Sequence, residues 1–330
     1  MLLVSGDLAR RTGGNLYDQR MERACRRAGV SLRIISAGST ARARAKLARL
    51  GPRVVVIDSI AIRIAAPLLG WMRAELRARV VALMHMQTRT RGTREVLRAA
   101  DRVIAVSPAL ARALSGTGVL RARPTVIPPG SDGIPRVSHG AGRSRDRGPL
   151  RVLAVANWSR AKGIAQLVAA ASDVPAVHLD LVGDTGSGAY RDAVIARIRS
   201  NVLGARVVVH GSLGERALAR RYAETDVFAL PTEREGYGIV FAEALAHGLP
   251  IIAADIASVR AIVGSAGLFV PPRRTRPLAA ALRLLTDAWL RRRLANAARA
   301  RARALPRWST SEALFVALVG SEMHAPVGDP

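Results

Sequence analysis

The sequence is poor in cysteine and histidine. Its 330 residues include one cysteine, Cys25, and six histidines. A single cysteine excludes any disulfide within the chain and is typical of a reducing compartment. The histidines are scattered, so no Cys/His cluster for structural zinc is expected. Cys25 falls within a helical pattern, which favours a place in the hydrophobic core over a catalytic role.

Long apolar runs are missing as well. Runs such as Val54 to Ile57 and Val80 to Met84 are far shorter than the ~20 residues that a membrane helix needs. The chain does not open with the charged, apolar and small-residue pattern of a signal peptide, so we expect a cytoplasmic protein. Hydrophobic residues make up 49% of the chain and charged residues 23%. This composition is sufficient to bury a core, and the length predicts two domains.

Acidic and aromatic residues are scarce, whereas arginine is abundant. The chain has 51 basic and 24 acidic residues, and all but Lys46 and Lys162 of the basic ones are arginines. Such a bias is typical of a GC-rich coding sequence and would leave the charge on a solvated surface. Residues 1–130 hold 24 basic and 7 acidic residues, a net charge of +17, and residues 131–330 hold the other 27 and 17, a net charge of +10. The more positive first part would attract anionic lipid head groups. Nucleic acid is the weaker candidate partner, because aromatic residues make up 4% of the chain and offer few surfaces for stacking bases.

Short β-rich runs alternate with helical patterns throughout the sequence. This alternation is typical of parallel βαβ units. Helical stretches such as Leu16 to Arg27 and Ile60 to Arg77 separate the runs. Strands are predicted at Leu2 to Val4, Leu32 to Ser36, Val54 to Asp58, Val80 to Met84, Val103 to Ser107, Thr125 to Pro128, Val152 to Ala156, Val177 to Val182, Val207 to His210, Val227 to Leu230, Ile251 to Ala253 and Leu268 to Val270.

These patterns predict an α/β fold of two tandem Rossmann-like, doubly wound parallel-sheet domains. Residues 133–149 are rich in Gly, Pro, Ser and Arg and lack periodicity, so they are interpreted as a linker between residues 1–132 and 150–305. Ligands bind such sheets beyond the carboxyl ends of the strands, which places the expected chemistry in an interdomain cleft. Residues 306–330 are predicted to hold a short helix, Ser309 to Val319, which could return to the first domain, and a tail.

The stretch from Ile239 to His247 has the pattern of a buried helix. It is apolar nearly all round, and Gly248 and Pro250 follow as a helix stop. A buried carboxylate is costly unless it is paired or hydrogen-bonded, so Glu243 should meet a fixed donor or the hydroxyls of a ligand such as ribose. A purely structural glutamate held by backbone amides is the alternative.

Two glycines precede this helix. Gly236 and Gly238 permit a tight turn whose backbone amides point toward a ligand, and the positive end of a helix favours a negative group such as a diphosphate there. Glycines that only make a turn are the alternative.

The stretch from residue 231 to 250 combines Pro231, Glu235, Gly236, Tyr237, Gly238, Glu243, Ala244, Gly248 and Pro250. Together they closely resemble the donor-site signature of the family 4 retaining glycosyltransferases, or glycosyl transferases group 1. The similarity extends on to Gly267, Leu268 and Val270 and back to Gly211 and to Thr225 to Pro231. It implies a GT-B fold with the nucleotide-sugar donor in the second domain, and metal-independent transfer without a cofactor.

The resemblance also implies roles for these residues. Glu235 would hold sugar hydroxyls and Glu243 the ribose, while the amides near Gly238 would hold the sugar or the diphosphate. Tyr237 and Ile239 are assigned to donor binding with them.

A second donor element lies between Ala154 and Ile164. Here a predicted strand leads to a helix that starts with Lys162 and Gly163, which resembles the family's phosphate-binding Lys-Gly. Asn157 stands where family members commonly have an arginine on the diphosphate, and Arg160 is the candidate replacement. A surface lysine at a helix start is the alternative for Lys162.

The first domain resembles the family more loosely. Gly13 and Gly14 resemble its glycine-rich loop, which approaches the diphosphate. His85 matches the place where members often present a histidine to the transferred sugar; a histidine that merely caps a strand beside Gln87 to Thr90 is the alternative.

The resemblance implies a front-face transfer in which fixed cations and amides neutralise the departing nucleotide diphosphate. Lys162, Arg160 and the backbones of Gly14 and Gly238 are the candidates for this role. No carboxylate emerges as a nucleophile for double displacement, and the sequence contains no Asp-x-Asp metal motif.

Other functions stay open at this point. A sugar phosphorylase or epimerase can use the same fold, and a non-enzymatic Arg-rich protein could bind nucleic acid or membrane. A dinucleotide-dependent oxidoreductase is disfavoured because no predicted strand is followed by Gly-x-Gly-x-x-Gly. The donor base, the sugar and the acceptor are not determined. The positive first part favours a lipid-linked or anionic acceptor at the inner face of the cytoplasmic membrane, in the synthesis of a glycolipid, polysaccharide or other glycoconjugate.

Overall fold

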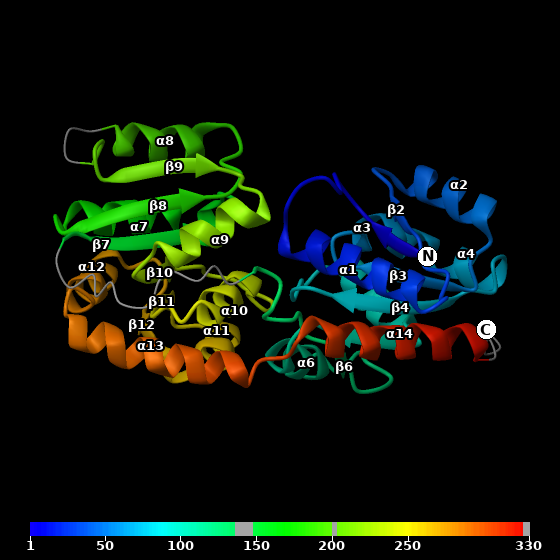
Figure 1. Cartoon of the computed structure of the whole chain (residues 1–330). Coiled ribbons are helices and arrows are strands. Elements are labelled where there is room, and N and C mark those ends of the chain that lie inside the picture. Colours follow the sequence, from blue (N-terminus) through cyan, green and yellow to red (C-terminus); the bar gives the residue numbers. More distant parts are fainter. Residues whose placement is uncertain (136–147, 200–202, 326–330) are drawn as a thin grey trace. The chain divides into compact units, whose positions relative to one another are not determined.

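The chain forms two compact domains, each built on its own parallel six-stranded sheet (Figure 1). The computed structural model describes residues 1–135, 148–199 and 203–325. The first domain comprises residues 1–129 and the segment from residue 306 onward, and the second comprises residues 130–305. Most of the predicted linker, 133–149, lies outside the described residues. The predicted fold class is confirmed.

The first sheet has the strand order β2-β1-β3-β4-β5-β6. All five residues of β3 are buried, as expected for a central parallel strand covered by helices on both faces. The strands are β1 (Leu2–Val4), β2 (Ile34–Ser36), β3 (Val54–Asp58), β4 (Arg79–Met84), β5 (Arg102–Ala105) and β6 (Thr125–Val126). The helices are α1 (Gly13–Arg27), α2 (Thr40–Leu50), α3 (Ile62–Ala65), η1 (Ala66–Leu68), α4 (Leu69–Ala74), α5 (Arg91–Ala99), α6 (Pro108–Ser115) and α14 (Trp308–His324).

The second sheet has the strand order β12-β11-β10-β7-β8-β9. Every predicted strand of the chain is present, with its bounds shifted by at most two residues. The strands are β7 (Leu150–Val155), β8 (Val177–Val182), β9 (Val207–Gly211), β10 (Val227–Leu230), β11 (Ile251–Ala254) and β12 (Gly267–Val270). The helices are η2 (Arg160–Lys162), α7 (Ile164–Ser172), α8 (Ala189–Ile198), α9 (Glu215–Ala223), α10 (Ile239–Ala246), α11 (Ala257–Val263), η3 (Gly264–Ala266), α12 (Thr275–Leu284) and α13 (Ala288–Arg303).

The predicted helical stretch from Ile60 to Arg77 is helical from Ile62 to Ala74, but it is not one regular α-helix. The segment divides into α3, η1 and α4, with the tighter turn of η1 at Pro67. Proline has no backbone N–H to donate, and its ring crowds the carbonyl four residues earlier. The helix is therefore interrupted where the periodic pattern of apolar residues continues.

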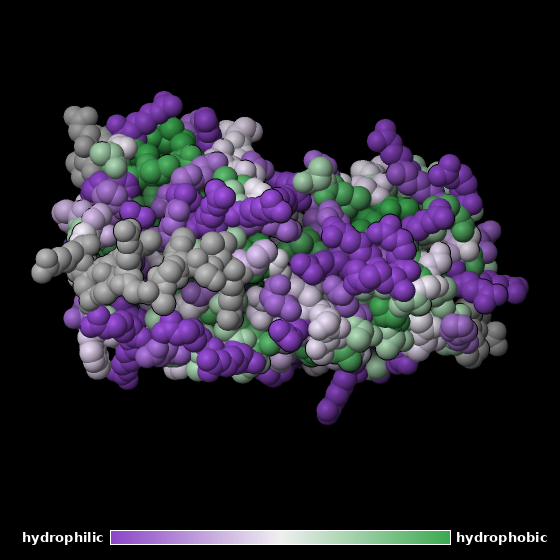
Figure 2. Space-filling view, in the orientation of Figure 1, coloured by the Kyte–Doolittle hydropathy of each residue, from purple (hydrophilic) through white to green (hydrophobic). Residues whose placement is uncertain are grey.

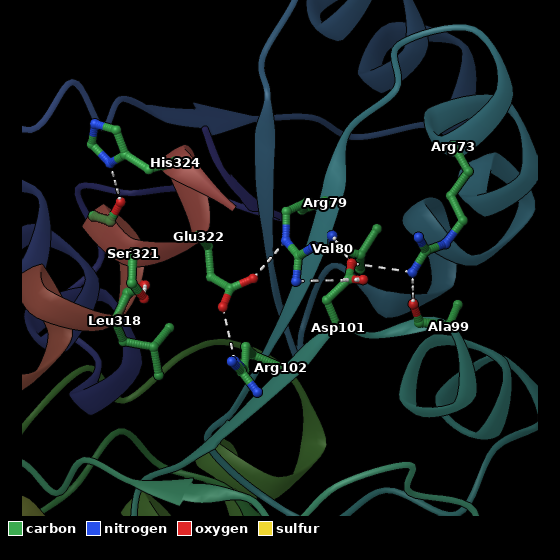
Figure 3. Close-up of polar contacts among 11 residues, drawn as sticks. Arg73, Arg79, Val80, Ala99, Asp101, Arg102, Leu318, Ser321, Glu322 and His324 are labelled. Carbon is green, nitrogen blue, oxygen red and sulfur yellow. Dashed lines mark hydrogen bonds and ion pairs between the residues drawn. The ribbon is translucent and has the colours of Figure 1, made fainter. Parts of the chain in front are cut away.

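The last helix is longer than the sequence predicts. Instead of Ser309 to Val319, α14 runs to His324 and packs against α1 and β3 of the first domain. Its polar end is held by Glu322, which is 2% exposed and accepts hydrogen bonds from Arg79 Nε at 2.6 Å and Arg102 Nε at 2.8 Å (Figure 3). These partners on β4 and β5 are distant in sequence, so local pattern does not indicate them.

We expect Glu322→Ala to lower the free energy of unfolding of the first domain by about 3 kcal/mol, because it removes the acceptor of a buried ion pair. Glu312→Ala on the same helix is the control. Glu312 is 16% exposed and pairs with Arg27, 62% exposed, at 2.6 Å and with Arg20, 26% exposed, at 3.7 Å. Pairs that water reaches contribute less than about 1 kcal/mol each, so the loss should be smaller than for Glu322. Denaturant unfolding of both variants measures the difference, and equal losses would contradict the assignment.

The arginines lie at the surface. Among the described residues no lysine or arginine is buried, whereas four carboxylates are: Asp18, Asp58, Glu243 and Glu322. Figure 2 shows hydrophilic residues over much of the visible face, with hydrophobic residues in smaller separate areas. Cys25 is buried and free, as predicted. In the described part of the chain, no helix combines the length and apolar character required to cross a membrane.

Candidate functional site

The loops that follow two central strands of the second sheet, β7 and β10, lie next to each other. From β7 the chain continues to β8 on one side, and from β10 it continues to β11 on the other, while β7 and β10 pair directly with each other. The loops that leave the carboxyl ends of β7 and β10 therefore begin side by side, as at the ligand-binding switch points of doubly wound sheets. These two loops carry most of the predicted donor-site residues.

Hydrogen bonds and one close approach join the two loops. The carbonyl of Ala161 accepts from the backbone N–H of Glu233 at 2.8 Å and from Thr232 Oγ1 at 3.2 Å. Gly163 has a φ of +70°, and a Cβ placed on it would lie 2.6 Å from the carbonyl oxygen of Pro231. Only glycine tolerates this combination of dihedral and contact. The Lys162–Gly163 turn is thus positioned on the loop after β10.

Lys162 and Glu235 form an ion pair across this junction. Lys162 Nζ lies 2.7 Å from Glu235 Oε2, and the two side chains are 28% and 15% exposed. The sequence suggested a separate ligand group for each of them. The structure instead places a cation and an acceptor for hydroxyl groups at one point.

The Glu-Gly-Tyr-Gly turn leads from Glu235 into α10. Gly238 has a φ of +96°, and an added Cβ would lie 2.7 Å from the ring of Phe241. Gly236, Tyr237 and Gly238 are buried, and Ile239 in the first turn of α10 is half-buried. Burial raises the pKa of Tyr237 to about 12, against a smaller opposing effect of Arg301. The first amides of α10 follow this turn, and the N-terminus of a helix favours a negatively charged group.

Glu243 is buried in α10 and has a fixed donor. The carboxylate is 5% exposed, and Tyr222 Oη donates to its Oε2 at 2.9 Å. Burial, followed by the charge of Glu243, raises the pKa of Tyr222. His247 stacks on the ring of Tyr222 at 4.8 Å, and its Nδ1 lies 2.9 Å from the carbonyl oxygen of Glu243.

Tyr222 does not figure among the residues predicted from the sequence. It lies on α9, and the available signal is its spacing of four residues from Leu218 on a buried helix face. A tyrosine in such a position needs an acceptor for its hydroxyl. The identity of that acceptor requires the tertiary structure.

Asn157 and Arg160 have partners within the second domain. Asn157 Oδ1 accepts from the backbone N–H of Asp184 at 3.1 Å, which links the loops after β7 and β8. The guanidinium of Arg160 lies 5.6 Å from the centre of the Tyr190 ring. Arg160 and Lys162 are the two ends of η2, so both cations belong to the loop after β7.

In the first domain, Gly14 and His85 come together. Gly14 is the second residue of α1, and His85 directly follows β4. A Cβ placed on Gly14 would lie 3.5 Å from His85 Cδ2. The histidine ring therefore borders the glycine-rich start of α1, and a side chain at position 14 would contact it.

Two aspartates that sequence reasoning missed meet the same histidine. His85 Nε2 lies 3.2 Å from Asp18 Oδ1 and 3.7 Å from Asp58 Oδ2, and both carboxylates are fully buried. Burial, with a smaller effect of the neighbouring Asp58 carboxyl, raises the pKa of Asp18 to about 7, against the opposing effect of His85. Burial alone would lower the pKa of His85, but the charge of Asp58 and the hydrogen bond and charge of Asp18 together raise it to about 9. One oxygen of each aspartate and one ring nitrogen of His85 all lie within 4.8 Å of one another. A divalent cation at this point is a chemical alternative to a hydrogen on His85 Nε2.

Comparison with protein families covers both domains. The family model described as Glycosyltransferase Family 4 matches residues 8–132, and the model described as Glycosyl transferases group 1 matches residues 142–301. Together they contain nearly all of the residues described above.

Among curated relatives, the D-inositol 3-phosphate glycosyltransferase of Kineococcus radiotolerans is 32% identical over 238 residues, which are 64% of this chain and 54% of the relative. The glycogen synthase of Mycobacterium tuberculosis is 32% identical over 178 residues, 52% and 42% of the two chains. The chain spans about half the length of the curated relatives it matches.

Solved structures show the same architecture. The sucrose-phosphate synthase of Thermosynechococcus elongatus superimposes with a TM-score of 0.81 at 22% identity, over 97% of this chain and 98% of the other. Anabaena HepE, solved with UDP-glucose, superimposes with a TM-score of 0.78 at 18% identity, over 97% and 99%. With its two parallel-sheet domains and its two family matches, the chain belongs to the family 4, group 1 glycosyltransferases and has their GT-B fold.

Proposed function

We propose that the protein transfers a sugar from a nucleotide diphosphate sugar to an acceptor, with retention of the anomeric configuration and without a metal ion. The observation that carries this proposal is the junction of the loops after β7 and β10. It combines the Lys162–Glu235 pair with the glycine turn that opens α10. A cation and backbone amides side by side are suited to a diphosphate leaving group.

Each part of the junction suits one part of a nucleotide sugar. Lys162, Arg160 and the amides of Gly236 to Ile239 face the diphosphate in this proposal, with Gly163 and Asn157 shaping the loop that holds them. An ammonium group has three donors, so Lys162 can bind a phosphate oxygen while it keeps Glu235 oriented. Glu235 then accepts from sugar hydroxyls, and Glu243 from the ribose.

Donor binding tests this proposal directly. UDP and UDP-glucose are the first ligands to try, since HepE was solved with each of them. We expect a saturating nucleotide sugar to raise the melting temperature, because a ligand at 100 times its Kd stabilises the native state by about 2.7 kcal/mol. If no nucleotide diphosphate or its sugar stabilises the protein, the donor-site proposal fails.

Glu243→Gln is expected to weaken nucleotide binding about tenfold, since a lost charge-assisted hydrogen bond is worth about 1.4 kcal/mol more than a neutral one. Glu233→Gln serves as the matched control. It lies beside the same junction but pairs with the exposed Arg273 at 2.7 Å, and its substitution should leave the Kd unchanged. Calorimetric titration with UDP compares the two, and an unchanged Kd for Glu243→Gln would contradict the ribose assignment.

Product analysis separates the alternatives. A phosphorylase requires inorganic phosphate or releases a sugar phosphate, and an epimerase converts the nucleotide sugar without any acceptor. The proposed transferase gives a glycoside whose anomeric configuration matches that of the donor, at a rate that EDTA does not change. A non-enzymatic binding protein would be indifferent to substitution of Glu235 and Glu243.

For the acceptor, we propose a lipid-linked or anionic molecule at the inner face of the cytoplasmic membrane. Residues 1–130 carry 24 basic against 7 acidic residues, and each basic side chain near an anionic surface contributes about 1 kcal/mol to membrane binding. Binding to vesicles that contain phosphatidylglycerol, absent with phosphatidylcholine alone and reversed by high salt, is the expected result. Equal binding to both would remove this support.

A further inference from the structure

The first domain contains a cluster of buried charge around His85. Asp18 comes from α1 and Asp58 ends β3, and both are 0% exposed. They approach the same ring nitrogen, Nε2 of His85, at 3.2 Å and 3.7 Å. When both carboxylates are ionised they can only accept hydrogen bonds, so Nε2 of His85 must then carry a hydrogen.

Neighbouring groups fix the direction of Asp58. Its Oδ1 accepts from Ser59 Oγ and from the backbone N–H of Ile60, both at 3.0 Å, which leaves Oδ2 facing His85. Within the described part of the chain, Oδ2 of Asp18 and Oδ2 of Asp58 have no hydrogen-bond partner. The backbone N–H of His85 donates to Ser59 Oγ at 3.2 Å, so the histidine is held to the same turn as Asp58.

The rest of the ring is not enclosed by charge. The ring packs edge-on against the Tyr17 ring at 5.3 Å between centroids, Gly14 borders its Cδ2, and the side chain is 15% exposed. The titratable groups packed against it in the described residues are Tyr17 and Asp18 of α1 and Asp58 at the end of β3. In the part of the chain that the structure describes, Nδ1 of His85 makes no hydrogen bond.

We propose that Asp18 and Asp58 are positioning residues that hold His85 as an imidazolium. Its Nε2–H donates to Asp18 beside the charge of Asp58, and its Nδ1–H is available to donate to a ligand oxygen. If the ring were neutral with its hydrogen on Nε2, Nδ1 would be an acceptor. The negative charge of the pair thus determines whether Nδ1 donates or accepts a hydrogen bond. The ligand oxygen, a hydroxyl of the transferred sugar or of the acceptor, rests on the proposed function.

The protonation state can be measured without any substrate. Nitrogen-15 NMR of the histidine rings resolves the protonation of Nδ1 and Nε2, and His85→Gln assigns the signal among the six histidines. We expect His85 to titrate with a pKa near 9, above its ordinary value of 6.5, and Asp58→Asn to lower that pKa by at least one unit. Glu95→Gln, at an exposed side chain of the same domain, should not shift it. The proposal would be overturned by a wild-type His85 pKa near 6.5. It would also be overturned if neither Asp18→Asn nor Asp58→Asn changed the pKa of His85.

Transfer activity provides the second readout. In the wild type the rate should fall as the pH rises through the pKa of His85, about 9, whereas in Asp58→Asn it should fall at a lower pH and recover on acidification. A purely structural role would reduce the rate equally at every pH, and that result would refute the positioning role. If the NMR shifts occur but no transfer is detected with any nucleotide sugar, the proposed function fails while the imidazolium assignment stands.

A metal ion is the competing occupant. After treatment with EDTA, the protein is titrated with Zn²⁺ and with Mn²⁺ by calorimetry. One equivalent bound by the wild type and not by His85→Gln would overturn the proposal, because the metal would take the place of the Nε2 hydrogen. Absence of such binding is the expected result.

Discussion

Lys162→Ala should lower kcat/KM for the donor about 100- to 1000-fold, which is the typical loss when one preorganised donor to a developing negative charge is removed. Lys162 Nζ is held by Glu235 at 2.7 Å in a partly buried position, so its charge is oriented before the donor arrives. Steady-state rates at limiting nucleotide sugar measure the loss.

The chain supplies its own control, since it has one other lysine. Lys46 lies on α2 and donates to the carbonyl of Ser36 at 2.8 Å. Lys46→Ala should leave the transfer rate unchanged. Lys162→Arg should not restore full activity, because a planar guanidinium does not reproduce the compact ammonium in a fitted position. A Lys162→Ala variant with full activity would remove the cation from the mechanism.

A double-mutant cycle tests whether the ion pair acts as a unit. The compared quantity is the loss of transition-state stabilisation, calculated from kcat/KM. If Lys162 and Glu235 depend on each other for position, the loss in the Lys162→Ala/Glu235→Gln double variant should be smaller than the sum of the losses in the two single variants. Additive losses would indicate that each residue binds its own part of the donor independently.

Gly163→Ala should be among the most destabilising single substitutions in the second domain, with a loss of at least about 3 kcal/mol in the free energy of unfolding. The added Cβ would lie 2.6 Å from the Pro231 carbonyl oxygen and 2.9 Å from its Cγ, at a φ of +70°. Backbone atoms cannot rotate away as a flexible side chain can. The loop after β7 must then move away from the loop after β10, so nucleotide binding should be lost as well.

Gly186→Ala separates the two causes of this loss. Gly186 has nearly the same φ, +64°, but a Cβ there meets no atom within 4 Å. A left-handed conformation by itself costs about 1–2 kcal/mol for a residue with a side chain. Denaturant unfolding and UDP titration of both variants compare strain alone with strain plus collision. Equal costs would mean that the contact with Pro231 contributes nothing.

The fold class follows from patterns that are local in the sequence. Parallel strands buried on both faces appear in the sequence as short apolar runs, and each run that was predicted to be a strand is one. Element ends were less predictable, because they depend on single backbone groups. Pro67 interrupts one predicted helix, and the contacts of Glu322 with Arg79 and Arg102 accompany the extension of another.

The sequence by itself determined which residues of the second domain are candidates for ligand binding. A lone carboxylate on an apolar helix must be buried with a partner, so Glu243 could be singled out from position alone, and the glycines around it could be read from the turn they permit. Only the tertiary structure identified the partners, because Tyr222 is 21 residues from Glu243, Lys162 is 73 from Glu235, and Asp18 is 67 from His85. Helical and strand periodicities relate residues within one element, whereas these pairs form where separate elements pack together. The spacing of two residues along the chain therefore does not predict such a contact.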